Sequence, residues 1–399
     1  MKQFAKPVLL KGMQIYAENQ FIQNGYLKLE NQKIAQYGSI ETLTSIEKFF
    51  VIEVPPSFKA VPGFIDVHIH GINGADVMDS TYDALNTMAQ TLPKEGTTSF
   101  LATTITQSIQ AIEKSLMNAG YYITQPQESG KAEILGIHLE GPFINKDRAG
   151  AQPTEFIIDP NIKLFKRWNI LAKNMIKLVT LAPERPGGLD MVKYLKKNGI
   201  IASIGHSDAT YHEAVEAIKA GANHVTHLFN GMRGLHHREP GIVGAALLHK
   251  ELLAEIIVDG IHIVPEMVKL AYQQKGKQGI ILITDSMRAK CLKNGVYDLG
   301  GQGITVSDEK ALLDGGTLAG SILKFSDGVK NMLNFSGCRL EDTIEMVSVN
   351  PAKQLNLFDR KGSIAIGKDA DIVVLNDQNE VALTYCRGIL SYRKGEEIK

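Results

Sequence analysis

Eight short apolar segments alternate with helix-like patterns over residues 64–287, and this alternation restricts the fold more than any other feature of the chain. The apolar segments lie at 64–70, 97–104, 133–141, 176–184, 199–207, 222–230, 253–263 and 279–287. Patterns with helical spacing lie between them at 82–92, 107–118, 160–173, 189–198, 211–220, 243–249 and 265–274, and others follow the eighth segment. Strands that alternate with helices form parallel sheets. Eight such units predict an α/β fold, specifically a TIM-like (β/α)8 barrel.

Both ends of the chain have a different texture, in which short β-like runs are separated by turn signals. These runs lie at 8–10, 14–16, 26–29, 33–37, 362–365, 371–375 and 381–385. Short alternating runs between turns are typical of a small antiparallel domain. We therefore predict a small β-sandwich domain built from 1–55 and 355–399, beside the (β/α)8 barrel at 56–354.

Composition and charge limit the partners of this chain. Its 399 residues include 43 Lys and Arg and 43 Asp and Glu, so no overall charge attracts nucleic acid. The apolar run at 8–10 is too short for a signal-peptide core, and no segment approaches a membrane span. Three scattered cysteines without C-x-x-C spacing indicate a reducing compartment: Cys291, Cys338 and Cys386. We expect a cytoplasmic protein that binds a small molecule and neither nucleic acid nor membranes.

The first apolar segment ends in the pattern His68-Ile69-His70. Side chains two residues apart in a strand share a face, so both imidazoles can reach one metal ion. Two histidines held by ordinary hydrogen bonds are the alternative. The rest of the barrel decides between these interpretations.

Polar side chains recur at the carboxyl ends of the predicted strands, where (β/α)8 barrels carry their active sites. In strand order they are His68 and His70, Glu140, His206, His227, Asp259 with His262, and Asp285. Four of these histidines and the glutamate are ligands suited to Zn²⁺, and also to Fe or Mn. We predict that Glu140, His206, His227, His68 and His70 bind one or two divalent metal ions.

Spacing separates the predicted ligands from two neighbouring histidines. His224 and His227 are three residues apart, so they cannot both point into the barrel from a regular strand. His227 stands at the strand end and is the predicted ligand. His138 shares a face with Glu140 but lies one layer deeper, so we place it in the core or behind the metal ligands.

Asp285 ends a strongly apolar strand, which suits a general base. A metal lowers the pKa of bound water to about 7, and a nearby carboxylate can take its proton and return it to the leaving group. A structural Asp that caps the following turn is the alternative.

The loop at 230–241 follows the sixth strand on the active-site side and is rich in glycine and basic residues. Arg233 and Arg238, with two histidines and glycine-freed backbone amides, could hold an anionic group such as a phosphate. A solvated loop is the alternative.

Nine motifs in order make the chain similar to the amidohydrolase superfamily nearly from end to end. They are PGFIDVHIHG (62–71), GIHLEGPFIN (136–145), GHSDAT (205–210), HVTHLFNGM (224–232), REPG (238–241), VDGIH (258–262), TDSM (284–287), TLAGS (317–321) and GSIAIGKDADIVVLN (362–376). They most resemble members that act on amino-sugar phosphates. This resemblance implies hydrolysis of the acetamide of N-acetyl-D-glucosamine 6-phosphate, giving D-glucosamine 6-phosphate and acetate. It also implies a divalent metal cofactor and a homodimer.

The resemblance further implies a role for each matching residue. Glu140, His206 and His227 would hold the principal metal, and His68 and His70, bridged by Glu140, a second one. Asp285 would act as the base and then as the acid.

Substrate contacts are likewise implied for Ala151, Gln152, Asn230, Gly231, Arg238, His262, Leu318, Ala319 and Gly320. His262 would lie near the scissile carbonyl, and Asn230, Gly231 and Arg238 would hold the phosphate. The turn at 318–320 would line the sugar pocket. The chain departs from some members at two positions: Gln152 stands where they have histidine, and Gly231 where they have alanine.

Two other functions fit parts of the pattern. Cyclic-amide or dihydroorotase-type hydrolases bridge two metals with a modified lysine at the end of strand four, but Lys177 stands at the start of that strand. A non-catalytic barrel scaffold needs neither the ligands nor the base, and all of them are present.

Overall fold

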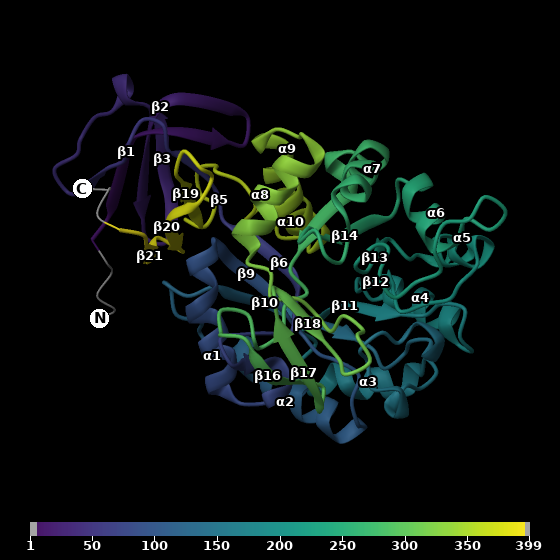
Figure 1. Cartoon of the computed structure of the whole chain (residues 1–399). Coiled ribbons are helices and arrows are strands. Elements are labelled where there is room, and N and C mark those ends of the chain that lie inside the picture. The colour runs from purple at the N-terminus through teal and green to yellow at the C-terminus, as the bar shows by residue number, and fades with distance from the viewer. Residues whose placement is uncertain (1–5, 396–399) are drawn as a thin grey trace.

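The computed structural model describes residues 6–395 and contains the predicted barrel (Figure 1). Its eight parallel strands are β6 (Phe64–Ile69), β9 (Thr97–Thr103), β10 (Glu133–Glu140), β11 (Ile176–Leu181), β12 (Ile201–Ile204), β13 (His224–Val225), β14 (Leu253–Ile257) and β15 (Ile280–Ile283). The strands hydrogen-bond to one another in chain order. A parallel bridge between Ile69 and Ser286 links the first strand to the last. The predicted (β/α)8 barrel is confirmed.

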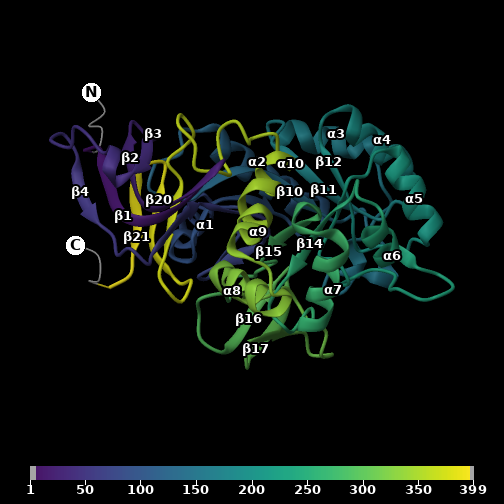
Figure 2. The ribbon, with the colours of Figure 1, turned by 90° about the horizontal axis from the view of Figure 1, so that it is seen from above.

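Helices surround the strands on the outside of the barrel (Figure 2). They are α1 (Tyr82–Thr91), α2 (Ile109–Thr124), α3 (Ile162–Leu171), α4 (Gly188–Lys197), α5 (Tyr211–Ala220), α6 (Gly241–Leu248), α7 (Pro265–Lys275) and α8 (Phe325–Ser336), followed by α9 (Leu340–Ile344), a π-helical turn (Glu345–Val349) and α10 (Asn350–Gln354). Short 3-10 turns lie at Ile40–Thr42, Val77–Asp79, Leu92–Glu95, Lys146–Arg148, Thr154–Phe156 and Lys277–Gly279. The seven helices predicted between the strands are present.

Local sequence explains where these helices begin and what they bury. A capping box between Thr210 and Glu213 starts α5, and Gly221 with φ of +124° ends it. Phe165 and Trp168 of α3 are fully buried in the largest apolar core, between the helices and the strands. No helix within residues 6–395 is both long enough and apolar enough to cross a membrane.

All eight barrel strands end earlier than predicted, and three of them, β12, β13 and β15, share a further feature. Each ends two residues before a predicted site residue, and that residue has a left-handed backbone: φ is +46° at His206, +32° at His227 and +49° at Asp285. Non-glycine residues adopt this conformation rarely, where the surrounding structure holds them. Turns, rather than strand alternation, therefore direct these three side chains.

The strands at the two ends of the chain form a separate β domain, as predicted (Figure 1). Its strands are β1 (Val8–Ala17), β2 (Gln20–Glu30), β3 (Lys33–Ser39), β4 (Phe50–Glu53), β5 (Lys59–Pro62), β19 (Ile372–Leu375), β20 (Val381–Cys386) and β21 (Ile389–Arg393). They form one sheet that branches at β1, which pairs with β2 on one edge and with β4 and β5 on the other. Apolar side chains from both termini share one core.

Details of this domain differ from the prediction. The run at 362–365 forms no strand, and Ile364 makes only an isolated bridge with Ala17, while β21 was not predicted. The border between 55 and 56 stays a prediction, because β5 pairs with strands of the β domain and β6 begins at Phe64. Residues 1–5 and 396–399 of the predicted domain lie outside the described residues.

An unpredicted three-stranded sheet follows β15: β16 (Gly295–Leu299), β17 (Gln302–Ser307) and β18 (Lys310–Leu312). Its strands are short and half exposed, so their alternation is a weak sequence signal. The Gly300 carbonyl accepts a hydrogen bond from the Gln107 side chain at 3.1 Å, and the Gln302 side chain donates to the Ala151 carbonyl at 2.6 Å. The insertion therefore contacts two loops at the carboxyl ends of the barrel strands. A two-stranded hairpin, β7 (Gly71–Ile72) with β8 (Ala75–Asp76), lies after β6.

A buried charge cluster joins the barrel to the β domain. Lys361 is 2% exposed and forms ion pairs with Glu133 of β10 at 2.8 Å, with Asp369 at 3.2 Å and with Asp371. Arg360 also binds Glu133, at 2.9 Å. Burial raises the pKa of Glu133, but the charges of Lys361 and Arg360 outweigh burial and lower this pKa to about 2.

We expect Glu133→Gln to lower the free energy of unfolding by about 3 kcal/mol at pH 7. The pKa of Glu133 is lower in the folded state than its ordinary 4.5, so its ionisation stabilises the fold above pH 4.5, and this contribution is lost as the pH falls toward 2. Urea unfolding at pH 7 and pH 3 checks this. The difference between wild type and variant should shrink at pH 3, whereas the same substitution at the exposed Glu128 should change little at either pH.

Candidate active site

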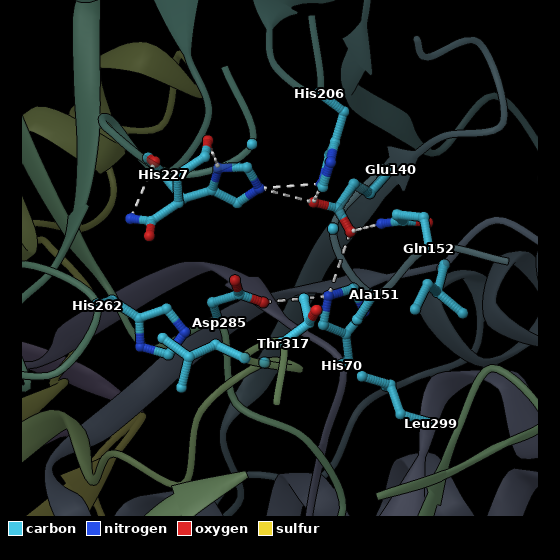
Figure 3. Close-up of a pocket in the computed structure, with 16 residues that line it drawn as sticks. His70, Glu140, Ala151, Gln152, His206, His227, His262, Asp285, Leu299 and Thr317 are labelled. Atoms are coloured by element: carbon cyan, nitrogen blue, oxygen red, sulfur yellow. Dashed lines mark hydrogen bonds and ion pairs between the residues drawn. The ribbon is translucent and has the colours of Figure 1, made fainter. Parts of the chain in front are cut away.

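A cavity of about 180 Å³ opens at the carboxyl ends of the barrel strands (Figure 3). Twelve residues predicted from strand ends or from the family resemblance line it: His70, Glu140, Ala151, Gln152, His206, His227, Asn230, Gly231, His262, Asp285, Leu318 and Gly320. Four further lining residues were not predicted: Ile105, Gly150, Leu299 and Thr317. A mixed cavity with convergent polar groups is typical of a small-molecule site.

Glu140, His206 and His227 meet at one point on the cavity wall. The Glu140 Oε1 atom lies 3.2 Å from His206 Nε2 and 3.3 Å from His227 Nε2, and the two Nε2 atoms are 3.1 Å apart. All three side chains are nearly fully buried. These separations are close to the edge of a tetrahedron with bonds of roughly 2.1 Å, which is about 3.4 Å.

The hydrogen bonds of the Nδ1 atoms in these two rings show which nitrogen of each histidine is left to bind a ligand. His206 Nδ1 lies 2.9 Å from the Arg148 carbonyl, and His227 Nδ1 lies 3.1 Å from the Asn230 carbonyl. A carbonyl only accepts, so each Nδ1 carries a proton, and Nε2 of each ring faces the other ring and Glu140 as the nitrogen left to bind a metal ion. Two ring nitrogens and a carboxylate oxygen that converge at one buried point form a ligand set for a cation. The residues therefore fit a metal ion of the kind bound by imidazole and carboxylate.

A second group lies on the other side of Glu140. His70 Nε2 is 3.3 Å from Glu140 Oε2 and 3.2 Å from Asp285 Oδ1, and His68 Nε2 is 3.3 Å from Glu140 Oε1 and 3.5 Å from Asp285 Oδ1. The His68 Nε2 atom is buried and has no hydrogen bond within the described part of the chain. Glu140 thus has ligand-type nitrogens on both sides, as a bridging carboxylate requires.

Charges in this second group set its protonation. Burial lowers the pKa of His70, but Asp285 and Glu140 outweigh burial and raise this pKa to about 10. Burial raises the pKa of Asp285, but His68 and His70 outweigh burial and lower it below its usual value. The pocket therefore favours a cation beside an ionised Asp285 carboxylate.

Two more predicted residues are held firmly at the cavity wall. The Gln152 amide nitrogen donates to Glu140 Oε2 at 2.7 Å, while its oxygen accepts from the Thr106 backbone amide at 2.8 Å. His262 Nδ1 lies 2.6 Å from Asp259 Oδ2. Burial lowers the pKa of His262, but Asp259 outweighs burial and raises it.

Three predicted residues do not line the cavity: His68, which lies behind it, and two predicted substrate contacts. Ala319 is fully buried in the small core beneath the β16–β18 sheet, and Arg238 lies on an exposed loop where its guanidinium contacts His237 at 2.6 Å. Arg233, predicted to help bind an anion, instead pairs with Asp208 at 2.5 Å. Asp208 also pairs with Arg148 at 2.7 Å, so one carboxylate holds both guanidiniums in place.

Residues behind the ligands complete the site. His224 points away from the cavity and bonds to Glu255 of β14 at 3.0 Å, and His138 bonds to Thr180 at 2.7 Å with its ring against that of His68. Sequence reasoning missed Glu255. A glutamate inside the apolar run of β14 was the signal that could have found it. Lys177 stands at the opposite end of β11 from the cavity.

Comparison with known proteins gives a consistent result. The chain matches the model of the amidohydrolase family over residues 60–390. It is 48% identical over 389 residues to the N-acetylglucosamine-6-phosphate deacetylase of Bacillus subtilis (strain 168), covering 97% of this chain and 98% of that protein. It is 36% identical over 332 residues to the N-acetylgalactosamine-6-phosphate deacetylase of Escherichia coli O157:H7, covering 83% and 87%. A solved Mycobacterium smegmatis N-acetyl-D-glucosamine-6-phosphate deacetylase mutant, in complex with N-acetyl-D-glucosamine-6-phosphate, has a TM-score of 0.90 at 28% identity, covering 97% of this chain and 100% of that chain.

We expect chelation of bound metal to lower the melting temperature, because it leaves the acceptors of Glu140, His206 and His227 facing one another. A metal at 100 times its dissociation constant stabilises a fold by about 2.7 kcal/mol. Calorimetry with and without chelator, alongside metal analysis, measures the effect. Glu140→Gln is the control and should bind little metal and show no chelator shift. An unchanged wild-type melting temperature after verified metal removal would contradict the assignment.

Proposed function

This chain belongs to the amidohydrolase family, and we propose that it is a metal-dependent deacetylase. Its proposed reaction hydrolyses N-acetyl-D-glucosamine 6-phosphate to D-glucosamine 6-phosphate and acetate in amino-sugar catabolism. The observation that carries the proposal is the convergence of Glu140, His206 and His227 beside Asp285 at one cavity. The name of the relative that is 48% identical supports the choice of substrate.

The metal site is assigned to the residues that need a cation. A divalent metal held by Glu140, His206 and His227 would polarise the acetyl carbonyl and lower the pKa of the attacking water to about 7. Imidazole and carboxylate ligands suit Zn²⁺ best and also accept Fe or Mn. His68 and His70, with Glu140 shared, offer a position for a second ion.

Asp285 carries the proton transfers of the reaction. Its ionised carboxylate accepts a proton from the water as the water oxygen bonds to the acetyl carbon. The same proton then passes to the amide nitrogen as the carbon–nitrogen bond breaks, so a neutral amine and acetic acid leave, and the acid then releases its proton to solvent to give acetate. Because His70 holds Asp285 Oδ1 at 3.2 Å, the carboxylate keeps one orientation through both transfers.

Neighbouring groups position the substrate. His262 is oriented by Asp259, and its other nitrogen is assigned to the acetyl carbonyl. Gln152 uses its oxygen and one N–H on Thr106 and Glu140, so its second N–H is available to the sugar. Ala151 and the turn at 318–320 are assigned to the walls of the sugar pocket.

The phosphate is assigned to the loop after β13. Asn230 and Gly231 line the cavity, and Arg238 lies farther along the same loop. A guanidinium can bind a phosphate through two hydrogen bonds.

Three cysteines without disulfides support a reducing, cytoplasmic compartment, and the homodimer stays a prediction.

The central test is acetate release by metal-loaded protein from N-acetylglucosamine with and without the 6-phosphate. We expect turnover of the phosphorylated sugar and much slower turnover of the free sugar, because the loop then lacks its anion. The N-acetylgalactosamine 6-phosphate isomer, tested in parallel, measures selectivity for the sugar. Absence of acetate from every phosphorylated sugar would leave only the fold and the metal site.

Replacing Asp285 by Asn should abolish turnover while the protein still binds metal at Glu140, His206 and His227. The amide keeps the size of the side chain but cannot accept the proton from water. Acetate assays with metal analysis on the same samples separate the two effects. A near-normal rate in this variant would remove Asp285 from the role of base.

Replacing Arg238 by Ala should raise KM for the phosphorylated sugar about tenfold or more and leave kcat nearly unchanged, because the phosphate binds equally in ground and transition states. Steady-state kinetics measures both constants. The matched control is Arg339→Ala at the start of α9, which removes an exposed arginine elsewhere and should change neither constant. An unchanged KM for Arg238→Ala would place the phosphate elsewhere.

A further inference from the structure

Glu255 is a fully buried carboxylate that lies behind the metal-type ligands and does not reach the cavity. It belongs to β14, and the apolar residues around it in this strand are also buried. A buried charge is retained only where it has partners that compensate its desolvation. Its partners therefore indicate what Glu255 does.

Two of these partners are metal-type ligands from strands that are not neighbours in the barrel. Glu255 Oε2 accepts a hydrogen bond from His68 Nδ1 at 2.9 Å and from the backbone amide of His227 at 3.2 Å. The other oxygen lies 3.0 Å from His224 Nε2. One carboxylate thus holds the ligand that follows β13 and the ligand of β6.

The bond to His68 fixes the state of that ring. An ionised carboxylate only accepts, so His68 carries a proton on Nδ1, and Nε2, which faces Glu140 and Asp285, is the nitrogen left to bind a metal ion. A carboxylate behind the ring also makes the imidazole a stronger ligand. His206 and His227 are held through their rings by backbone carbonyls, whereas His68 depends on this side chain.

The hydrogen bonds from Glu255 to the segment after β13 hold a strained turn. His227 has φ of +32° and Phe229 has φ of +82°, both in the left-handed region. Glu255 binds the amide of His227 through its side chain and the amide of Leu228 through its own carbonyl, at 2.8 Å. The turn that presents His227 therefore rests on Glu255 at two successive amides.

We propose that Glu255 is a positioning residue of the metal centre, which sets the tautomer of His68 and couples this ligand to the turn that presents His227. It acts through these ligands and does not touch the reacting atoms. The inference rests on the metal site of the proposed function. Without the carboxylate, His68 can carry its proton on Nε2, and the position formed by His68 and His70 weakens first.

Two variants measure how the charge and the hydrogen bonds of Glu255 contribute to metal affinity. Glu255→Gln keeps the shape and an acceptor for His68 but removes the charge, while Glu255→Met removes both. Binding of Zn²⁺ is measured by competition with a chelator, and bound metal is counted after dialysis, at a temperature where each variant is folded. Loss of a group behind a metal ligand lowers affinity by about 10- to 100-fold. We expect a loss near tenfold for Gln and a larger one for Met, with the ion at His68 and His70 lost first.

The matched control is Glu95→Gln, which neutralises another buried carboxylate. Glu95 pairs with Lys290 at 2.7 Å and has no hydrogen bond to any of the five metal-type ligands, so its loss should lower stability but not metal affinity. Equal metal affinity in Glu255→Gln and wild type overturns the proposal, even where Glu255→Met fails to fold. An equal loss in Glu95→Gln also overturns it. Absence of acetate release from wild type with metal bound contradicts the proposed function alone, because the affinities are measured without substrate.

Discussion

Three buried ligand-type side chains that converge on one point govern the interior of this barrel. Glu140, His206 and His227 come from different strand ends, and the backbone carbonyls behind the two rings turn both Nε2 atoms toward Glu140. Such an arrangement is unfavourable in an apolar interior unless a cation occupies it. The fold therefore gathers a ligand set suited to a divalent metal, while His68 and His70 keep the neighbouring Asp285 carboxylate ionised.

The barrel and most of the site could be predicted because they follow from two periodic rules. Alternating strands and helices specify the barrel, and the barrel rule places its active site at the strand ends. His68, Glu140 and Asp285 therefore converge although they are far apart in sequence. The order of the strands, and not any local motif, brings them together.

The remaining features escaped prediction for physical reasons. The β16–β18 sheet buries few side chains, so its alternation is weak. Arg233 was predicted to bind an anion, but its pairing with Asp208 depends on a loop contact that spacing does not reveal. Glu255 was not predicted because it lies inside β14, whereas the barrel rule places site residues at the strand ends. The left-handed turns at His206 and His227 could not be foreseen either, since tertiary contacts hold them against local preference.

The branched sheet has a consequence for folding during synthesis on the ribosome. Strands β1 to β5 leave the ribosome before the barrel, whereas β19 to β21 leave it after the barrel. Until then the edge of β5 that later pairs with β19 is open, and apolar side chains such as Leu27 lack the C-terminal half of their core. Open edges invite pairing with other chains. The open edge of β5 thus persists through the synthesis of the entire barrel and is covered only when β19 arrives.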